Sequence, residues 1–273
     1  MAEPLVLSGS SVGTYRRCPQ WWYFEYVERQ TRPMRLKQAR GLAAHEAVEL
    51  DLDHRVRTWQ HLPVEILVEK FEKQYDEYAR ESPDVQGKDT KAGIREAGIR
   101  AIIAWRANVA PSIDPRFVEL SGQFMFDGVH YSWTADLIDW DWLVRDWKFV
   151  AKKPSDKHWD GGPDYTINMQ GYELGVGSLL DRKMAGWQLD QMVCLKRDTP
   201  YLVQDFHDPI TEDEEQEFKD TVGEVHDRIL AGQFPALGLN NGACSWCPFA
   251  DGTCKPEREA RLADEARRQP DYE

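Results

Sequence analysis

The chain has 273 residues, of which 41% are hydrophobic and 11% aromatic, a composition typical of a packed globular protein rather than a disordered one. It carries 34 basic and 47 acidic residues, and the net charge of −13 argues against a generic nucleic-acid coat protein. Basic residues are nevertheless concentrated in residues 16–40 and 148–157, so a locally basic groove can still bind phosphates. No apolar run approaches the ~20 residues of a membrane span, and residues 1–10 are too short and polar for a signal peptide. We therefore expect a soluble, cytoplasmic protein.

The first 115 residues are expected to be mainly helical. Ser8 and the serines after it make a good N-cap for a helix that runs to Cys18 and on through an aromatic segment. Residues 31–40 are basic and are expected to form a loop. Three stretches show helical spacing of apolar side chains and are expected to form scaffold helices: one that begins at Gly41 and carries His45, one over residues 64–78, and one over residues 94–105.

After residue 116 the pattern changes to the two-residue alternation of strands. Asp127-Gly128 is a strong hairpin signal between two such strands. A second turn, near residues 140–142, would place Asp136 beside Asp146. The sequence therefore predicts a meander of three to four strands.

The stretch from Ala135 to Lys148 holds the chemistry. Side chains alternate across a strand, so Asp146 and Lys148 project to the same face, and the turn adds the carboxylate of Asp136. Two carboxylates and an ammonium can seat a divalent metal and an activated water. Taken alone, the stretch is equally compatible with surface strands that carry a solvated salt bridge.

The second half of the chain is expected to alternate helices, strands and loops. The elements that we expect are a loop over residues 151–163, a helix over 166–180 that contains Gln170, a hairpin of residues 187–195 and 201–206, a helix over 212–230 capped by Thr211, and a frayed helix over 255–273.

Five cysteines in a chain without a secretion signal argue against a disulfide framework. Cys244, Cys247 and Cys254 supply three thiolates, one fewer than tetrahedral zinc or a four-iron cluster requires. Cys18 is the natural fourth, because Cys18 and Cys247 each precede a proline and lie among aromatic residues. Spacing alone leaves zinc and iron–sulfur equally open, and we expect Cys194 to be a buried core thiol.

Together these motifs resemble the RecB-like branch of the PD-(D/E)XK nuclease superfamily, and most closely its iron–sulfur exonucleases of the CRISPR-associated type. The resemblance spans nearly the whole chain and depends on the order of many motifs, each of which is common by itself. In chain order these are Ser10-Ser11, Tyr15-x2-Cys18-Pro19, Gly41-x3-His45, Asp136-x2-Asp139, Asp146-x-Lys148, Gln170, and the cysteines Cys244, Cys247 and Cys254.

The chain departs from the family pattern at three points. Ala135 stands where the family commonly has Gly before its first acid. Leu174 stands where Tyr usually follows Gln170, with Tyr172 nearer instead. The spacing from Asp136 to Asp146 is also short, which implies a tight hairpin.

The resemblance implies an α/β (α+β) fold with a restriction-endonuclease-like mixed central sheet flanked by helices, an N-terminal helical region and a C-terminal iron–sulfur tail. It implies a single nuclease domain over residues 1–273, which divides into an N-terminal helical part (1–115), a catalytic sheet core (116–210) and a C-terminal helix with the cysteine tail (211–273).

The resemblance also assigns roles to individual residues. His45, Asp136, Asp146 and the carbonyl of Trp147 would bind one or two Mg²⁺ or Mn²⁺ ions. Lys148 would orient the attacking water and stabilise charge on the scissile phosphate, and Gln170 would belong to the motif of the following helix. Glu119 would be the acid of the preceding strand. The four residues expected to hold a [4Fe–4S] cluster are Cys18, Cys244, Cys247 and Cys254.

The implied function is that of a metal-dependent DNA exonuclease that hydrolyses phosphodiester bonds at single-stranded ends, with a structural cluster. The alternatives are a non-catalytic DNA-end-binding or nuclease-complex adaptor that retains the fold and cluster, and a zinc-stapled partner-binding protein. The expected partners are DNA and, because the chain has no G-x4-G-K-[ST] motif, a helicase, recombination or CRISPR-adaptation protein. Cleavage polarity, exonuclease or endonuclease action, oligomeric state and pathway stay open.

Overall fold

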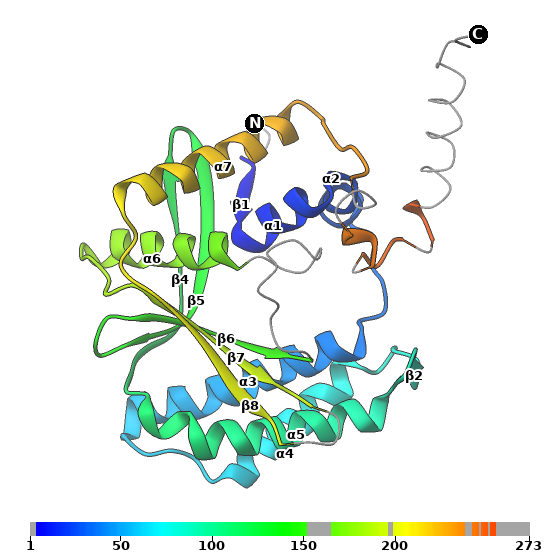
Figure 1. Ribbon diagram of the computed structural model, residues 1–273, viewed down its shortest axis with the longest axis vertical. Coiled ribbons are helices and arrows are strands. Elements are labelled where there is room, and N and C mark those ends of the chain that lie inside the picture. The colour runs from blue at the N-terminus through cyan, green and yellow to red at the C-terminus, as the bar shows by residue number, and fades with distance from the viewer. Residues whose placement is uncertain are drawn as a thin grey trace.

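The computed structural model describes residues 4–151, 165–195, 199–237, 242–245, 247–250 and 252–254. These residues form a mixed sheet with helices on both faces (Figure 1). The elements are, in chain order, β1 (Val6–Ser8), α1 (Gly9–Arg17), α2 (Pro19–Trp22), the π-helix η1 (Tyr23–Val27), α3 (Leu36–Thr58), α4 (Val64–Tyr78), β2 (Val85–Gln86), β3 (Asp89–Thr90), α5 (Lys91–Asn108), the 3₁₀ turn η2 (Ala110–Ser112), β4 (Pro115–Phe126), β5 (Val129–Asp139), β6 (Val144–Val150), α6 (Thr166–Leu180), β7 (Trp187–Val193), β8 (Tyr201–His207), α7 (Glu212–Leu230) and η3 (Ala243–Ser245).

The main sheet is organised around β5. One edge of β5 pairs with β4 in antiparallel register along nearly its whole length. The other edge is shared, since β1 pairs with its beginning in parallel and β6 pairs with its end in antiparallel register. Beyond β6 the sheet continues with β7, parallel to β6 through the crossover helix α6, and with β8, antiparallel to β7. The expected α/β architecture, a mixed central sheet flanked by helices, is confirmed.

Apolar side chains of the two sheet faces pack against different helices. The helices α3, α4 and α5 cover one face, where Leu137, Trp147 and Phe149 belong to their core. The helices α1, α6 and α7 cover the other face, where Tyr131, Trp133 and Val144 belong to a second core. Figure 1 shows these two helical layers on opposite sides of the strands. Within the described part of the chain, no helix has the length and hydropathy needed to cross a membrane.

Most of the expected elements are confirmed, and the hairpin turns follow the expected chemistry. Asp127 and Gly128 both have positive φ, 46° and 79°, as a type I′ turn requires. Thr211 and Glu214 form a reciprocal capping box at the start of α7. The helices over 64–78, 166–180 and 212–230 and the hairpin of β7 and β8 also have the expected positions.

Two of the N-terminal expectations are wrong in detail. The first helix does not run through Cys18, which is extended with φ −163°, because a residue before proline is disfavoured in the helical region. The next long helix begins at Leu36 rather than Gly41, so part of the expected basic loop is helical. Its start is bound by the Gln86 side chain, which accepts a hydrogen bond from Leu36 N at 3.0 Å, and sequence periodicity does not reveal such a tertiary partner. All but the first residue of the loop expected over 151–163, and the whole tail helix expected over 255–273, lie outside the described residues.

Glu173, a buried acid on α6, links this helix to the segment before α7. Only 3% of its surface is exposed, and its Oε1 accepts a hydrogen bond from Ile210 N at 3.0 Å. Its Oε2 has no hydrogen-bond partner in the described structure. Burial raises the pKa of Glu173 from 4.5 to about 7, against the opposing effect of the Ile210 N–H.

Because the folded state holds the Glu173 proton more tightly than the unfolded state does, stability should fall as pH rises from the unfolded pKa through the folded pKa. We expect Glu173→Gln to increase the free energy of unfolding at pH 8 by about 1–3 kcal/mol, and the gain to disappear near the unfolded pKa. Urea unfolding across this range measures the difference. Glu217→Gln, a change of an exposed acid on α7, is the matched control, and a gain independent of pH would contradict this account.

Candidate active site

The candidate site lies where β5 and β6 stop pairing. Only two residue pairs join these strands, Leu137 with Arg145 and Ile138 with Val144. Asp136 and Asp146 are the next residues beyond the last pair, one on each strand. The turn between β5 and β6 places these two residues close together, as expected. Beyond the last pair the two strands diverge, and both carboxylates lie at the point of divergence.

The backbone of Trp147 at this fork is bonded to side chains. Trp147 N donates to Asp136 Oδ2 at 3.0 Å, and Trp147 O lies 2.5 Å from His45 Nε2. His45 comes from the middle of α3, and its Nδ1 lies 3.4 Å from Asp136 Oδ2. Burial lowers the pKa of His45, against the opposing effect of the Asp136 charge, which favours the neutral imidazole that binds metals.

Asp146 and Lys148 lie on the same face of β6, as the alternation of a strand requires. Lys148 Nζ lies 2.5 Å from Asp146 Oδ2, while Asp146 Oδ1 is buried and has no hydrogen-bond partner among the described residues. Burial and then the charge of Asp136 raise the pKa of Asp146 to about 7. Burial alone would lower the pKa of Lys148, but the charges of Asp146 and Asp136 raise it above its ordinary range, so Lys148 stays an ammonium.

Two glutamates enlarge the negative cluster. Burial, followed by the charges of Asp136, Glu49 and Asp146, raises the pKa of Glu119 on β4 to about 7. Glu119 also has a positive φ of 51°, uncommon for a residue with a side chain. Glu49 was missed by the sequence analysis, although it lies four residues after His45 and so on the same helix face.

The described contacts between the α6 region and the acidic cluster come from tyrosines. Gln170 is half-buried, and within the described structure it makes no hydrogen bond to the acidic cluster. Tyr165 and Tyr172 approach instead. Lys148 Nζ lies 5.3 Å from the centre of the Tyr165 ring, and burial, followed by the charge of Asp146, raises the pKa of Tyr172 to about 12. The sequence analysis noted Tyr172 as a departure from the family pattern and overlooked Tyr165.

The donors at the fork suit a divalent cation in kind. As they stand, no three His, Cys, Asp or Glu side chains of the described residues could together hold a metal ion. The carboxylates of Asp136 and Asp146, the Trp147 carbonyl and the His45 imidazole are nevertheless the ligand types that Mg²⁺ and Mn²⁺ use. The buried, unpartnered Oδ1 of Asp146 is the atom that a cation would satisfy, and its desolvation cost explains why such atoms are rare outside functional sites.

The four cysteines expected to act together lie in one neighbourhood. Cys18 and Cys247 are buried with Phe24 and Phe249, and Cys254 packs against this cluster. Burial raises the pKa of the Cys247 thiol to about 11, against the opposing effect of the Phe249 N–H. The charges of the other three cysteines also raise it. A metal ion binds Cys as the thiolate, so metal binding at these residues would release protons.

Contacts between the two ends of the chain hold this cysteine neighbourhood. Phe249 N donates to Cys247 Sγ at 3.4 Å, as a backbone N–H does for a metal-bound sulfur. Arg35 donates to Cys247 O at 3.2 Å, and Arg32 donates to Thr253 Oγ1 at 2.7 Å. In Figure 1 the orange C-terminal segment lies beside the blue α2. Trp246, which precedes Cys247 in the sequence, lies outside the described residues, and Cys194 is buried elsewhere, in the core of α3, α4 and α5.

Comparisons with known proteins bear on the fold and on the family of this chain. No curated protein matches the chain at a significant level. Among solved structures, the chain is similar to a "Putative exonuclease" from Eubacterium rectale, with 12% identity over 84% of this chain and 83% of that chain and a TM-score of 0.53. It is also similar to SSO0001, with 12% identity over 92% of this chain and 86% of that chain and a TM-score of 0.43. At such identity the first of these shows a shared fold.

The family model for the PD-(D/E)XK nuclease superfamily matches residues 6–254. The match includes the fork of β5 and β6, the His45 helix and all four clustered cysteines. It confirms the superfamily that the order of motifs predicts: this chain belongs to the PD-(D/E)XK nuclease superfamily.

Proposed function

We propose that this protein is a divalent-metal-dependent DNA exonuclease that hydrolyses phosphodiester bonds at single-stranded ends. The observation that carries the proposal is the convergence of Asp136, Asp146, Lys148, His45 and the Trp147 carbonyl at one fork of the sheet. An adaptor that only binds DNA would not need the buried carboxylate of Asp146 together with the half-buried Asp136 carboxylate and Lys148 ammonium. We therefore favour catalysis over binding alone.

In this proposal His45, Asp136, Asp146 and the Trp147 carbonyl hold one or two Mg²⁺ or Mn²⁺ ions. A bound ion would polarise the scissile phosphate and lower the pKa of the attacking water. Lys148, held beside Asp146, orients that water and stabilises the negative charge that develops on the phosphate. Glu119 on β4, which the charge of Asp136 affects, and Gln170 on α6 would complete the site.

The proposed preference for single strands rests on the aromatic and basic residues around Cys18. The Arg17 guanidinium lies 4.8 Å from the centre of the Trp21 ring, and Tyr26 is exposed beside Trp22, with the ring centres 5.2 Å apart. Stacked rings and cations are the combination that binds unpaired nucleotides. Because the chain lacks a nucleotide-binding P-loop motif, any unwinding would come from a helicase or recombination partner, or a CRISPR-adaptation partner.

We propose further that Cys18, Cys244, Cys247 and Cys254 hold a [4Fe–4S] cluster with a structural role. The aromatic surroundings and the N–H bond to Cys247 Sγ support it, because cluster sulfurs are stabilised by shielding and by backbone donors. The cluster would join the two ends of the chain beside α2.

Replacing Lys148 with Met or Asp146 with Asn should lower kcat on labelled single strands in Mn²⁺ by at least about 100-fold, because the charge that stabilises the transition state or holds the cation is lost. Strands blocked at the 5′ or the 3′ end measure activity and polarity together. Lys219→Met on α7 is the matched control. If both site variants cleave as fast as the parent, the assignment of these residues is wrong. If the parent binds DNA but does not cleave it, the result favours the non-catalytic adaptor function.

Metal binding can be tested without turnover. Mn²⁺ should raise the thermal unfolding midpoint of the parent, since a ligand that binds only the folded state adds about 2.7 kcal/mol at 100 times its Kd. Asp136→Asn and Asp146→Asn should abolish most of this shift, whereas Glu217→Gln should keep it. An equal shift in all four proteins would place the metal elsewhere.

The cluster makes a separate prediction. Anaerobically purified protein should be brown with broad visible absorption, and Cys18→Ser or Cys254→Ser should lose the iron and destabilise the fold, because the bond between the chain ends is broken. Cys194→Ser is the control that should stay brown. A colourless preparation with stoichiometric zinc, which has a filled d shell, would instead establish the zinc alternative.

A further inference from the structure

An exposed row of indoles and guanidiniums lies at the turn that joins β5 to β6. Its members, which we call the Trp–Arg ladder, are Trp59, Trp140, Arg116, Trp142 and Arg182. Trp59 and Trp140 stack with ring centres 6.0 Å apart. The Arg116 guanidinium carbon lies 4.5 Å from the centre of the Trp140 ring and 3.7 Å from that of Trp142. Arg182 lies 3.7 Å from the same Trp142 ring, and two guanidiniums this close must occupy opposite faces of one indole.

Trp142 is half-buried and packs against the second core, but burial does not explain the other two rings of the ladder. Trp59 is 65% exposed and Trp140 is 47% exposed, so most of these two ring surfaces faces water. Trp59 and Trp142 also have positive φ values of 60° and 66°. Trp59 adopts this conformation as the C-cap of α3, where its N–H donates to Arg55 O at 2.8 Å. Trp142 adopts it in the turn between β5 and β6, where its N–H donates to Asp139 O at 3.1 Å, so the surrounding structure imposes both.

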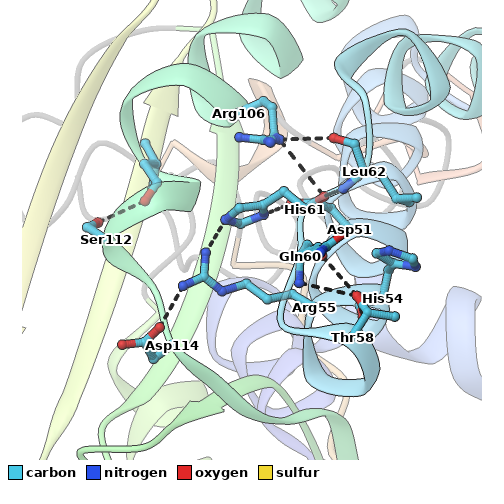
Figure 2. Close-up of polar contacts among 11 residues, drawn as sticks. Asp51, His54, Arg55, Thr58, Gln60, His61, Leu62, Arg106, Ser112 and Asp114 are labelled. Carbon is cyan, nitrogen blue, oxygen red and sulfur yellow. Dashed lines mark hydrogen bonds and ion pairs between the residues drawn. The ribbon is translucent and has the colours of Figure 1, made fainter.

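A polar network fixes the end of α3 that carries Trp59 (Figure 2). Arg55 on the last turns of α3 forms an ion pair of 2.6 Å with Asp114, just before β4. The backbone carbonyl of Asp114 accepts a hydrogen bond from Trp140 N at 3.0 Å. The helix end and the strand turn are therefore joined through one residue, which sets Trp59 against Trp140.

The same network is anchored in the interior. Asp51, fully buried on α3, accepts a hydrogen bond from Leu62 N at 2.7 Å and lies 2.6 Å from His61 Nδ1. His61 in turn contacts Arg55. Figure 2 shows these contacts around the loop after α3. They fix the position of the loop that follows Trp59.

The strand turn is equally well fixed. Asp139 is buried, and its Oδ1 accepts hydrogen bonds from Asp141 N at 3.0 Å and Leu143 N at 2.9 Å. Its Oδ2 accepts from Arg145 Nε at 3.0 Å. A rigid display of exposed rings lowers the entropy cost of binding a flexible ligand.

Charge indicates the ligand. In the part of the chain that the structure describes, neither Arg116 nor Arg182 forms an ion pair with a carboxylate. Nearby, Asp114 is paired with Arg55 and Asp139 with Arg145, which leaves Asp141 and Asp181 as the exposed acids next to the ladder residues in the chain. Guanidiniums that stack through their faces keep their N–H edges for an anion, and phosphate is the anion that accompanies stacking bases.

We propose that the Trp–Arg ladder binds unpaired bases of single-stranded DNA as the strand runs on from the acidic cluster. This inference rests on the proposed nuclease function, because the ladder continues the two strands that carry Asp136 and Asp146. Trp140 comes four residues after Asp136 along the extended chain, a span of roughly 13 Å. Bases would stack on Trp59 and Trp140, and the arginines would contact the neighbouring phosphates.

The test compares the parent with Trp59→Ala/Trp140→Ala, and uses Phe206→Ala on β8, 57% exposed, as the matched control. The probe is a fluorescent oligothymidylate of about 20 nucleotides, with Ca²⁺ in place of Mg²⁺ and binding followed by anisotropy. The ladder variant should bind on the order of tenfold more weakly, because a stacked base contributes strongly to affinity. The control should bind like the parent. Trp140→Tyr, which keeps an aromatic face, should retain most of the affinity that Trp140→Ala loses.

A strand of abasic residues separates stacking from general effects on the fold. It keeps the phosphates but offers no rings, so the parent and the ladder variant should bind it equally. In cleavage, the ladder variant should also lose most of the advantage of the long strand over one of about four nucleotides.

Equal affinity of the parent and the ladder variant for the long strand overturns this inference and leaves the surface to a protein partner. If the parent still cleaves, the nuclease function stands without the ladder. A parent that neither binds nor cleaves DNA overturns both.

Discussion

Where β5 and β6 stop pairing with each other, the sheet opens between them, although each strand is paired along its other edge. β5 is held by β4 on its other edge and β6 by β7, so neither strand can close the gap. The backbone groups of Trp147 then turn to His45 and Asp136, because buried N–H and C=O groups must find partners. A hydrophobic sheet thus acquires a polar site without losing its two cores.

The fork concentrates negative charge more than it neutralises it. Lys148 faces Asp146 and Asp136, while Glu119 and Glu49 lie close enough to alter each other's charge state. A structural ion pair would balance its charges, since uncompensated buried charge is costly. The excess of carboxylates over ammonium supports the proposal that this site binds a cation, to which the neutral His45 would add a nitrogen donor.

Hydrogen bonds also connect the two ends of the chain. The C-terminal cysteine segment is bound by Arg32 and Arg35, which lie before α3, and α3 carries His45 at its middle and Trp59 just beyond its end. The cysteine neighbourhood, the acidic cluster and the Trp–Arg ladder are therefore connected through one helix.

The sequence by itself determined the superfamily, through the order of its motifs along the chain. It also determined the mixed sheet and the placement of Asp146 and Lys148 on one face, because strand alternation and turn chemistry are local. It also indicated Cys18 as the partner of the C-terminal cysteines, through the shared proline and aromatic context. The tertiary structure decided which groups meet across the fold: Tyr165 and Tyr172 approach Lys148, whereas Gln170 makes no hydrogen bond to the cluster in the described structure. Only packing could decide this, since the rotation of α6 against β6 depends on all the side chains between them. The same holds for the Trp–Arg ladder, whose members come from four separate segments.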